Sequence, residues 1–180
     1  MISASKTRKS MVKAVVFLAG MVACSAPIAF GAEWRIDVVD SGAPGKFSAL
    51  KLDSDGNLHL AFVAEDGLRN PLKYGFWDRR LERWFVMTVA EGASFCSLVL
   101  DSKNRPHISW ADYGGASGAK LRYARWEGQS WKKIAIPLNS DIVGYFTSIA
   151  LDARDNPRIS FYEYRGPKGT DLAVRMRVVS

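Results

Sequence analysis

The chain has 180 residues, of which 48% are apolar and 12% aromatic, with a formal net charge of +7. This composition excludes a disordered chain and provides enough apolar surface for a substantial core. The charge is uneven, because four of the 25 basic residues lie at the N-terminus.

Residues 1–32 have the layout of a secretory signal peptide. Four basic residues and no acidic residue are accompanied by an apolar run over 14–23, and Ala29-Phe30-Gly31 is a small-x-small cleavage site. The run is shorter than the roughly 20 residues of a membrane-spanning helix. We therefore predict no membrane span and a periplasmic or secreted protein. The alternative is a lipoprotein signal, because Met21-Val22-Ala23-Cys24 loosely matches the pattern that precedes a lipidated cysteine, and the protein would then be anchored through Cys24.

Removing Lys6, Arg8, Lys9 and Lys13 leaves 21 basic residues against 18 acidic ones, a net charge of +3. This weak and dispersed charge excludes a nucleic-acid partner. Cys96 is the one cysteine after residue 32, so no intrachain disulfide can form. It lies between Phe95 and Leu98 in a predicted strand, and we expect its thiol to be buried.

An internal repeat organises residues 33–180. The segments 50–62, 98–110 and 149–161 match position for position, with aspartates at 53, 101 and 152. A tryptophan opens the segment before each copy, at 34, 84 and 131. A period of this length, filled with short alternating strands, is typical of a β-propeller. The sequence predicts an all-β propeller of three blades, with repeats over about 34–83, 84–130 and 131–180.

Each repeat is predicted to contain four strands. In the first, FSALKL and LHLAF flank the turn at 53–57, and LKYGFW and WFVMTV flank the turn at 78–83. Alternation of apolar and polar residues between clusters of Gly, Asn, Asp and Pro is the hairpin signal. No stretch has sustained helical spacing.

The two ends of the repeat region are complementary. Leu172–Ser180 aligns with the third strands, so the last repeat lacks a fourth strand, whereas Trp34–Val39 matches the fourth strands WFVMTV and WKKIAI. We predict that this N-terminal strand is the fourth strand of the last blade. Because propellers usually have 4 to 8 blades, the chain is predicted to form either an open arc or half of a six-bladed ring, as a homodimer.

The motifs in Asn104–Trp110 and Leu121–Trp131 resemble those of bacterial secreted β-propeller repeat proteins, which are similar to sialidase-like and fucose-lectin-like propellers. The resemblance covers residues 33–180. It departs from true sialidases, because the Asp-box Ser-x-Asp-x-Gly-x-x-Trp is absent and no arginine triad or tyrosine nucleophile can be aligned. Glycosidase activity is therefore not carried over.

The repeated polar residues have structural interpretations. His59, His107 and Arg158 occupy the same repeat position, which predicts a solvent-facing strand residue and not a metal ligand. The aspartates at 53, 101 and 152 precede turns and are expected to cap backbone amides. The tryptophans at 34, 77, 84, 126 and 131 are expected to pack between blades. The sequence contains no cofactor or metal motif.

The candidate ligand site is the face formed by the loops between second and third strands, over 64–71, 112–120 and 163–171. Its candidate residues are Asp112, Tyr113, Glu163, Tyr164 and Arg165. Aromatic rings beside carboxylates and arginine suit a carbohydrate. We predict a non-catalytic binding or scaffold module for a glycan or protein ligand. The alternatives are a glycan-active hydrolase of sialidase-like fold and a truncated fragment of a longer propeller without a function of its own.

Overall fold

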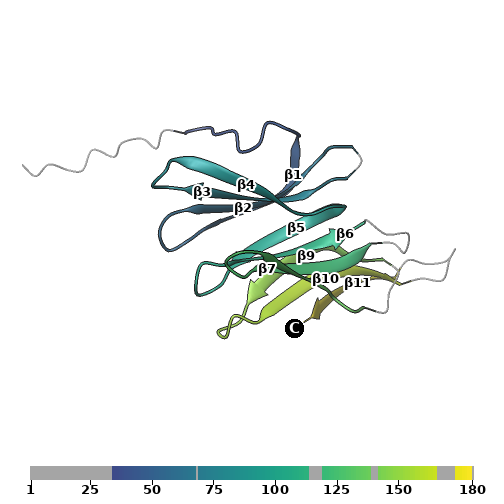
Figure 1. Ribbon diagram of the computed structural model, residues 1–180. Coiled ribbons are helices and arrows are strands. Elements are labelled where there is room, and N and C mark those ends of the chain that lie inside the picture. Colours follow the sequence, from purple (N-terminus) through teal and green to yellow (C-terminus); the bar gives the residue numbers. More distant parts are fainter. Residues whose placement is uncertain (1–33, 68, 114–118, 139–141, 166–172, 180) are drawn as a thin grey trace, which may run out of the picture. The chain divides into compact units, whose positions relative to one another are not determined.

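The computed structural model describes residues 34–67, 69–113, 119–138, 142–165 and 173–179 (Figure 1). The chain divides into two units, Met1–Ile36 and Asp37–Ser180, and all strands belong to the second. The strands are β1 (Gly45–Leu52), β2 (Leu58–Ala64), β3 (Leu72–Asp78), β4 (Arg83–Ala90), β5 (Ala93–Leu100), β6 (Pro106–Asp112), β7 (Lys120–Trp126), β8 (Trp131–Ala135), β9 (Ile142–Leu151), β10 (Pro157–Arg165) and β11 (Ala173–Val179). Within the described ranges, no helix is long and apolar enough to cross a membrane.

These strands form three antiparallel sheets. The first has the order β1-β2-β3-β4, the second β5-β6-β7-β8, and the third β9-β10-β11. Each sheet is a meander around one of the matching segments 50–62, 98–110 and 149–161, because antiparallel pairing of consecutive strands needs no crossover. The fourth strands β4 and β8 contain the tryptophans that open the next repeat. The all-β prediction is confirmed for the described residues, and the sheets are consistent with partial blades of a propeller.

The aspartate at the start of each first hairpin caps its turn, as predicted. Asp53 Oδ1 accepts hydrogen bonds from the backbone N–H groups of Asp55 (2.9 Å) and Asn57 (2.8 Å). Asp101 and Asp152 bind the amides two and four residues ahead in the same way. The repeat of Asp at this position therefore reflects local turn chemistry.

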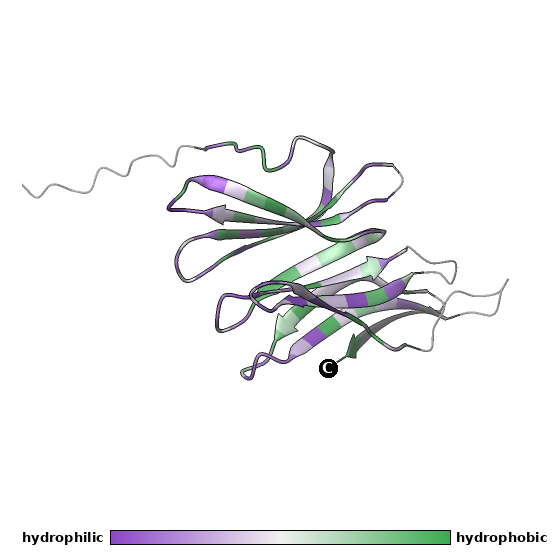
Figure 2. Ribbon diagram, viewed as in Figure 1, coloured by the Kyte–Doolittle hydropathy of each residue, from purple (hydrophilic) through white to green (hydrophobic). Residues whose placement is uncertain are grey.

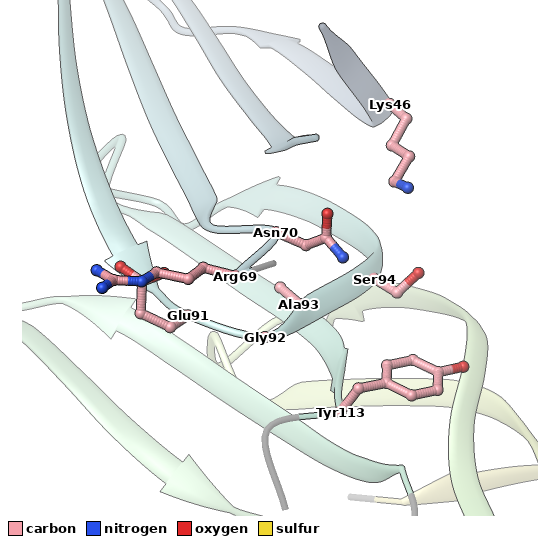
Figure 3. A pocket seen from close by; sticks show the side chains of 8 residues that line it. All are labelled: Lys46, Arg69, Asn70, Glu91, Gly92, Ala93, Ser94 and Tyr113. Carbon is pink, nitrogen blue, oxygen red and sulfur yellow. The ribbon is translucent and has the colours of Figure 1, made fainter. Parts of the chain in front are cut away.

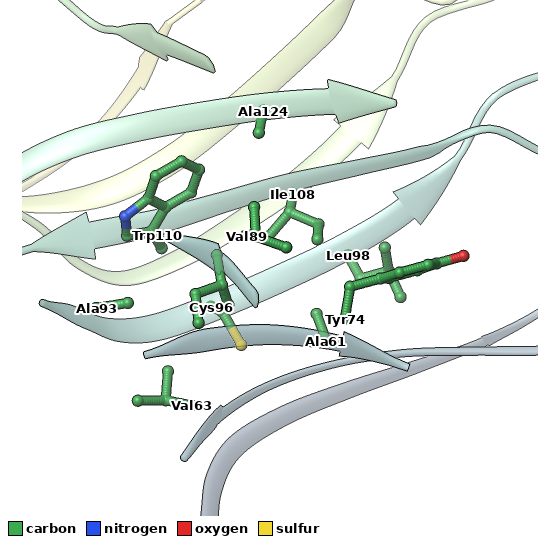
Figure 4. Packing of buried hydrophobic residues seen from close by; sticks show 11 residues of the cluster. Ala61, Val63, Tyr74, Val89, Ala93, Cys96, Leu98, Ile108, Trp110 and Ala124 are labelled. Atoms are coloured by element: carbon green, nitrogen blue, oxygen red, sulfur yellow. The ribbon is translucent and has the colours of Figure 1, made fainter. Parts of the chain in front are cut away.

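The apolar core lies between the sheets. One cluster joins the first and second sheets and includes Tyr74, Cys96 and Trp110 (Figure 4). Another contains Leu121, Tyr123, Val143, Ile149, Ile159 and Phe161 from the second and third sheets. Apolar and polar residues alternate along the strands, and the turns are mostly polar (Figure 2). Cys96 is buried as expected, and burial raises the pKa of its thiol to about 12.

The tryptophans do not all occupy the predicted interblade positions. Trp131 does, since its ring lies 5.2 Å from that of Tyr74 in the first sheet and its indole N–H donates to Met87 Sδ. Trp77 and Trp84 pack on each other within the first sheet at 5.7 Å. Trp34 is 93% exposed, so the expectation of a packed ring is wrong for this residue.

The ends of the chain differ from the prediction. Trp34–Val39 forms no strand, and the third sheet has three strands among the described residues. β11 is a third strand as predicted. Its register differs from the prediction: Tyr162 is the repeat equivalent of Val63, and it pairs with Met176, whereas Val63 pairs with Leu72. The predicted alignment, in which Leu172 begins the third strand in the way that Leu72 does, is therefore wrong. The reason is that β10 and β11 remain paired up to Arg165 and Ala173.

Candidate functional site

A pocket of about 470 Å³ lies at the end of the first and second sheets where the second-to-third loops emerge (Figure 3). Its lining is Lys46, Arg69, Asn70, Glu91, Gly92, Ala93, Ser94 and Tyr113. These residues come from the start of β1, the β2–β3 loop, the β4–β5 connection, the start of β5 and the position directly after β6. The pocket is thus assembled from two repeats.

Backbone hydrogen bonds hold the segments of the pocket together. Gly92 N–H donates to Arg69 O (2.6 Å) and Ala93 N–H to Asn70 O (3.0 Å). On the other side, Tyr113 N–H donates to Gly92 O (2.6 Å). In the β2–β3 connection, Asp66 Oδ1 accepts hydrogen bonds from the backbone N–H groups of Arg69 (2.7 Å) and Asn70 (2.8 Å). These hydrogen bonds tie the segments that line the pocket to one another, and small-ligand sites are usually largely pre-formed.

The polar lining carries both signs of charge. Lys46 Nζ lies 2.8 Å from Glu65 Oε1, in a solvent-exposed ion pair. In Figure 3, Arg69 and Glu91 lie on one side of the pocket and Ser94 and Tyr113 on the other. The site therefore offers guanidinium donors, a carboxylate acceptor and a hydroxyl around one concave surface.

Asn70 is an unusual member of this lining. Its backbone φ of 42° is in the left-handed region, which Asn adopts more readily than most residues. Its side-chain Oδ1 is buried and has no hydrogen-bond partner among the residues that the structure describes. Such orphaned polar atoms are rare in proteins.

Aromatic rings extend from the pocket along the first strands of the sheets. Tyr113, 41% exposed, lies 5.6 Å from Tyr145 in an edge-on arrangement. Phe95 lies 4.5 Å from both Phe47 and Phe146. These three phenylalanines are repeat equivalents, and all have positive φ, at 52°, 51° and 48°. A left-handed bulky residue is strained by roughly 1–3 kcal/mol. The pairing with the second strand shifts register at each of these phenylalanines, so a β-bulge recurs in each first strand.

The predicted site residues are only partly brought together. Tyr113 lines the pocket, whereas Asp112 accepts a 2.8 Å hydrogen bond from Arg122 Nε beside a smaller hollow. The prediction that Glu163, Tyr164 and Arg165 lie in a loop is wrong, because β10 continues through Arg165. Glu163 is 1% exposed within this strand. The side chains of Tyr164 and Arg165 lie outside what the structure describes.

Sequence reasoning missed most of the lining. Lys46, Arg69 and Glu91 stand in unlike contexts in the sequence, and no repeat or spacing relates them. The available signal was the phenylalanine that recurs at 47, 95 and 146 beside the polar loops.

The two histidines have a structural role that the sequence reading also missed. His59 and His107 are 4% and 3% exposed, so the prediction that they face solvent is wrong. His107 Nδ1 lies 2.6 Å from Tyr123 Oη and Nε2 lies 3.4 Å from Asp101 Oδ2. His59 lies in the same way between Tyr74 and Asp53. Burial lowers the pKa of both imidazoles, against the hydrogen bond to the aspartate.

The third repeat differs from the first two at the histidine position, and this difference is the reason that the prediction of a solvent-facing residue fails for His59 and His107. Arg158 replaces the histidine and is half exposed, with Nη2 3.2 Å from Asp152 Oδ2. Register places Val178 opposite Ser160, where Tyr123 lies opposite Ser109. The third sheet thus lacks both the imidazole and the phenol, and a solvated arginine takes their place.

The fold and site define an all-β protein of propeller-type blades with a polar, aromatic-edged pocket between two of them. No family model and no curated protein matches the chain. Among solved structures it is similar to a fucose lectin from Kordia zhangzhouensis in complex with methyl-fucoside, at 19% identity and a TM-score of 0.46 over 71% of this chain and 96% of the lectin.

It is also similar to an endo-arabinase from Bacteroides thetaiotaomicron, at 13% identity and a TM-score of 0.53, over 78% of this chain and 58% of the enzyme. A xylan β-1,4-xylosidase from Bacillus halodurans matches at 14% identity and a TM-score of 0.51, over 74% of this chain and 30% of the enzyme. The chain therefore spans between about a third and three fifths of these hydrolases. At such identities the likeness shows a propeller-type fold.

The described residues contain no group of three or more His, Cys, Asp or Glu side chains that could hold a metal ion.

Proposed function

We propose that the protein is an exported, non-catalytic module that binds a glycan in the pocket between the first and second sheets. The observation that carries the proposal is that Arg69, Glu91 and Tyr113 line one hollow whose segments are joined by backbone hydrogen bonds. Sugars present hydroxyl groups around an apolar ring face. Guanidinium and carboxylate groups exchange hydrogen bonds with hydroxyls, and a tyrosine ring covers the apolar face.

The proposed module binds a glycan without hydrolysing it. Glycoside hydrolysis requires two carboxyl groups across the scissile bond, about 5 to 9.5 Å apart. Glu91 is the one carboxylate among the residues that line the pocket. Glu163 is fully buried in β10, and the Asp112 carboxylate is paired with Arg122. The lining therefore offers binding groups without an acid and base pair.

A glycan array followed by calorimetry tests the binding site. Arg69→Ala, Glu91→Gln and Tyr113→Ala are each expected to lower affinity at least tenfold, with an unchanged circular dichroism spectrum. Arg80→Ala is the matched control, since Arg80 lies in the exposed β3–β4 turn. Affinity that survives all three substitutions would refute the site.

Chromogenic glycosides test the second part of the proposal. We expect no turnover by the wild-type protein. Hydrolysis that disappears in Glu91→Gln would identify a glycan-active enzyme instead.

A further inference from the structure

Among the described residues, the third sheet has an edge strand with one unpaired side, β11. β4 and β8 cover the outer edge of the third strand in the first and second sheets. β11 pairs with β10 and with no other described strand (Figure 1). Unpaired backbone donors and acceptors along such an edge favour the addition of another strand.

The segment Trp34–Val39 has the pattern of that missing strand but is not paired. It aligns without gaps with Trp84–Val89 of β4. Trp34 is 93% exposed, Ile36 91% and Val38 75%. Apolar side chains at every second position are the pattern of a strand that buries one face.

The end of this segment already lies where a fourth strand would end. Val39 and Asp40 border a hollow on the first sheet with Lys73, Val86, Met87 and Thr88. Ala90, at the end of β4, borders a hollow on the second sheet with Arg122, Lys133, Ile134 and Ala135. In the repeat alignment, Asp40 corresponds to Ala90, Lys73 to Arg122, and 86–88 to 133–135.

Specific contacts hold Val39 and Asp40 in this place. Asp40 forms an ion pair with Lys73, whose hydrogen bond lowers the pKa of the Asp40 carboxyl. A Cβ on Gly75 would lie 3.3 Å from Val39 Cγ1, so the valine packs directly on the β3 backbone. Val39 and Asp40 therefore lie on the first sheet in the position that the end of β4 occupies on the second sheet.

That preceding blade cannot be the chain's own third sheet. Val39 lies against Gly75, while the neighbouring residue Tyr74 packs in the core shared with the second sheet. Since successive residues of a strand point to opposite faces, Val39 is on the face that turns away from the second sheet. The third sheet packs on the other side of the second.

The open face of the first sheet also has the composition of a blade interface. Its residue Leu50 is equivalent to Leu98 and Ile149. Leu98 is 1% and Ile149 7% exposed, each buried against the preceding sheet, whereas Leu50 is 55% exposed. In the second and third sheets, this repeat position is therefore covered by the preceding sheet.

We propose that the first sheet of one copy packs on the third sheet of a second copy, and that Trp34–Val39 pairs with β11 of that copy as its fourth strand. Two copies that exchange strands in this way have six blades, within the usual range for a closed ring. This inference does not depend on the proposed function.

The junction between copies is expected to be weaker than the junctions within a chain. Inside the chain, adjacent turns are linked by Ser54–Asn104 and Ser102–Asp155 hydrogen bonds, at 2.6 Å each. The equivalent residues at the new junction are Ala153 and Gly56, which have no side-chain donor or acceptor. Dilution should therefore separate the copies before the sheets unfold.

Light scattering on the purified protein at 1–100 μM tests the proposal. We expect the mass of a dimer, and a monomer for Ile36→Pro, which removes a strand amide, and for Leu50→Asp, which charges the open face. Leu81→Asp is the control, because Leu81 is 57% exposed in the β3–β4 turn and should leave the dimer intact. Circular dichroism verifies that each variant is folded, and if one does not fold the other decides.

A folded wild-type monomer throughout this range would overturn the inference. So would a dimer that survives both substitutions, or a larger assembly with a different number of copies.

Discussion

The buried Tyr123–His107–Asp101 chain allows a sharp test of how the second sheet is stabilised. Tyr123, His107 and Asp101 are 4%, 3% and 5% exposed. Because the Asp101 carboxylate can only accept, the neutral imidazole carries its proton on Nε2, and Nδ1 must accept from the Tyr123 hydroxyl. Tyr123→Phe keeps the ring and removes this donor, leaving Nδ1 buried and unpaired.

An orphaned buried acceptor costs roughly 1–3 kcal/mol. For a domain of this size, the melting temperature should then fall by about 3–10 °C. Urea unfolding measures the change directly, as a lower midpoint with an unchanged slope. Tyr162→Phe is the matched control, since the Tyr162 ring packs edge-on against Phe146 and its hydroxyl has no hydrogen bond to a described residue. We expect its stability to change by less than about 0.5 kcal/mol. A similarly small change in Tyr123→Phe would refute the role assigned to the hydroxyl.

The remaining predictions concern protonation, the thiol and export. The folded pKa of His59 and His107 lies below the ordinary value, so their contribution to stability is complete above about pH 6.5 and is lost as pH falls below it; the urea midpoint should fall from pH 7 to pH 5, and less steeply in His107→Gln. Backbone hydrogen bonds from Asn156 and Arg154 lower the pKa of Asp152 to about 2, so its capping contribution should persist until far lower pH. The Cys96 thiol should resist a thiol reagent in the native protein at pH 8 and react in urea; fast native labelling would contradict its burial. Mass spectrometry of the exported protein should find residues 1–31 removed, whereas an acylated Cys24 would establish the lipoprotein alternative.

The sequence by itself determined the repeat, the sheets and their turns. Alternation along strands and the capping of amides by Asp53, Asp101 and Asp152 act over a few residues, so they can be read from local spacing. The same spacing predicted that β11 is a third strand, though not its register. Pairing register depends on where the hairpin closes, and the tertiary structure decided that at Arg165 and Ala173.

Only the tertiary structure decided the environment of the polar residues. The sequence predicts that His59 and His107 are exposed, because their tyrosine and aspartate partners lie on neighbouring strands and turns. Arg69, Glu91 and Tyr113 come from three separate connections, and no sequence interval relates them. Their presence around one pocket depends on how one sheet packs on the next, through contacts between residues far apart in the chain, and such contacts have no local signature.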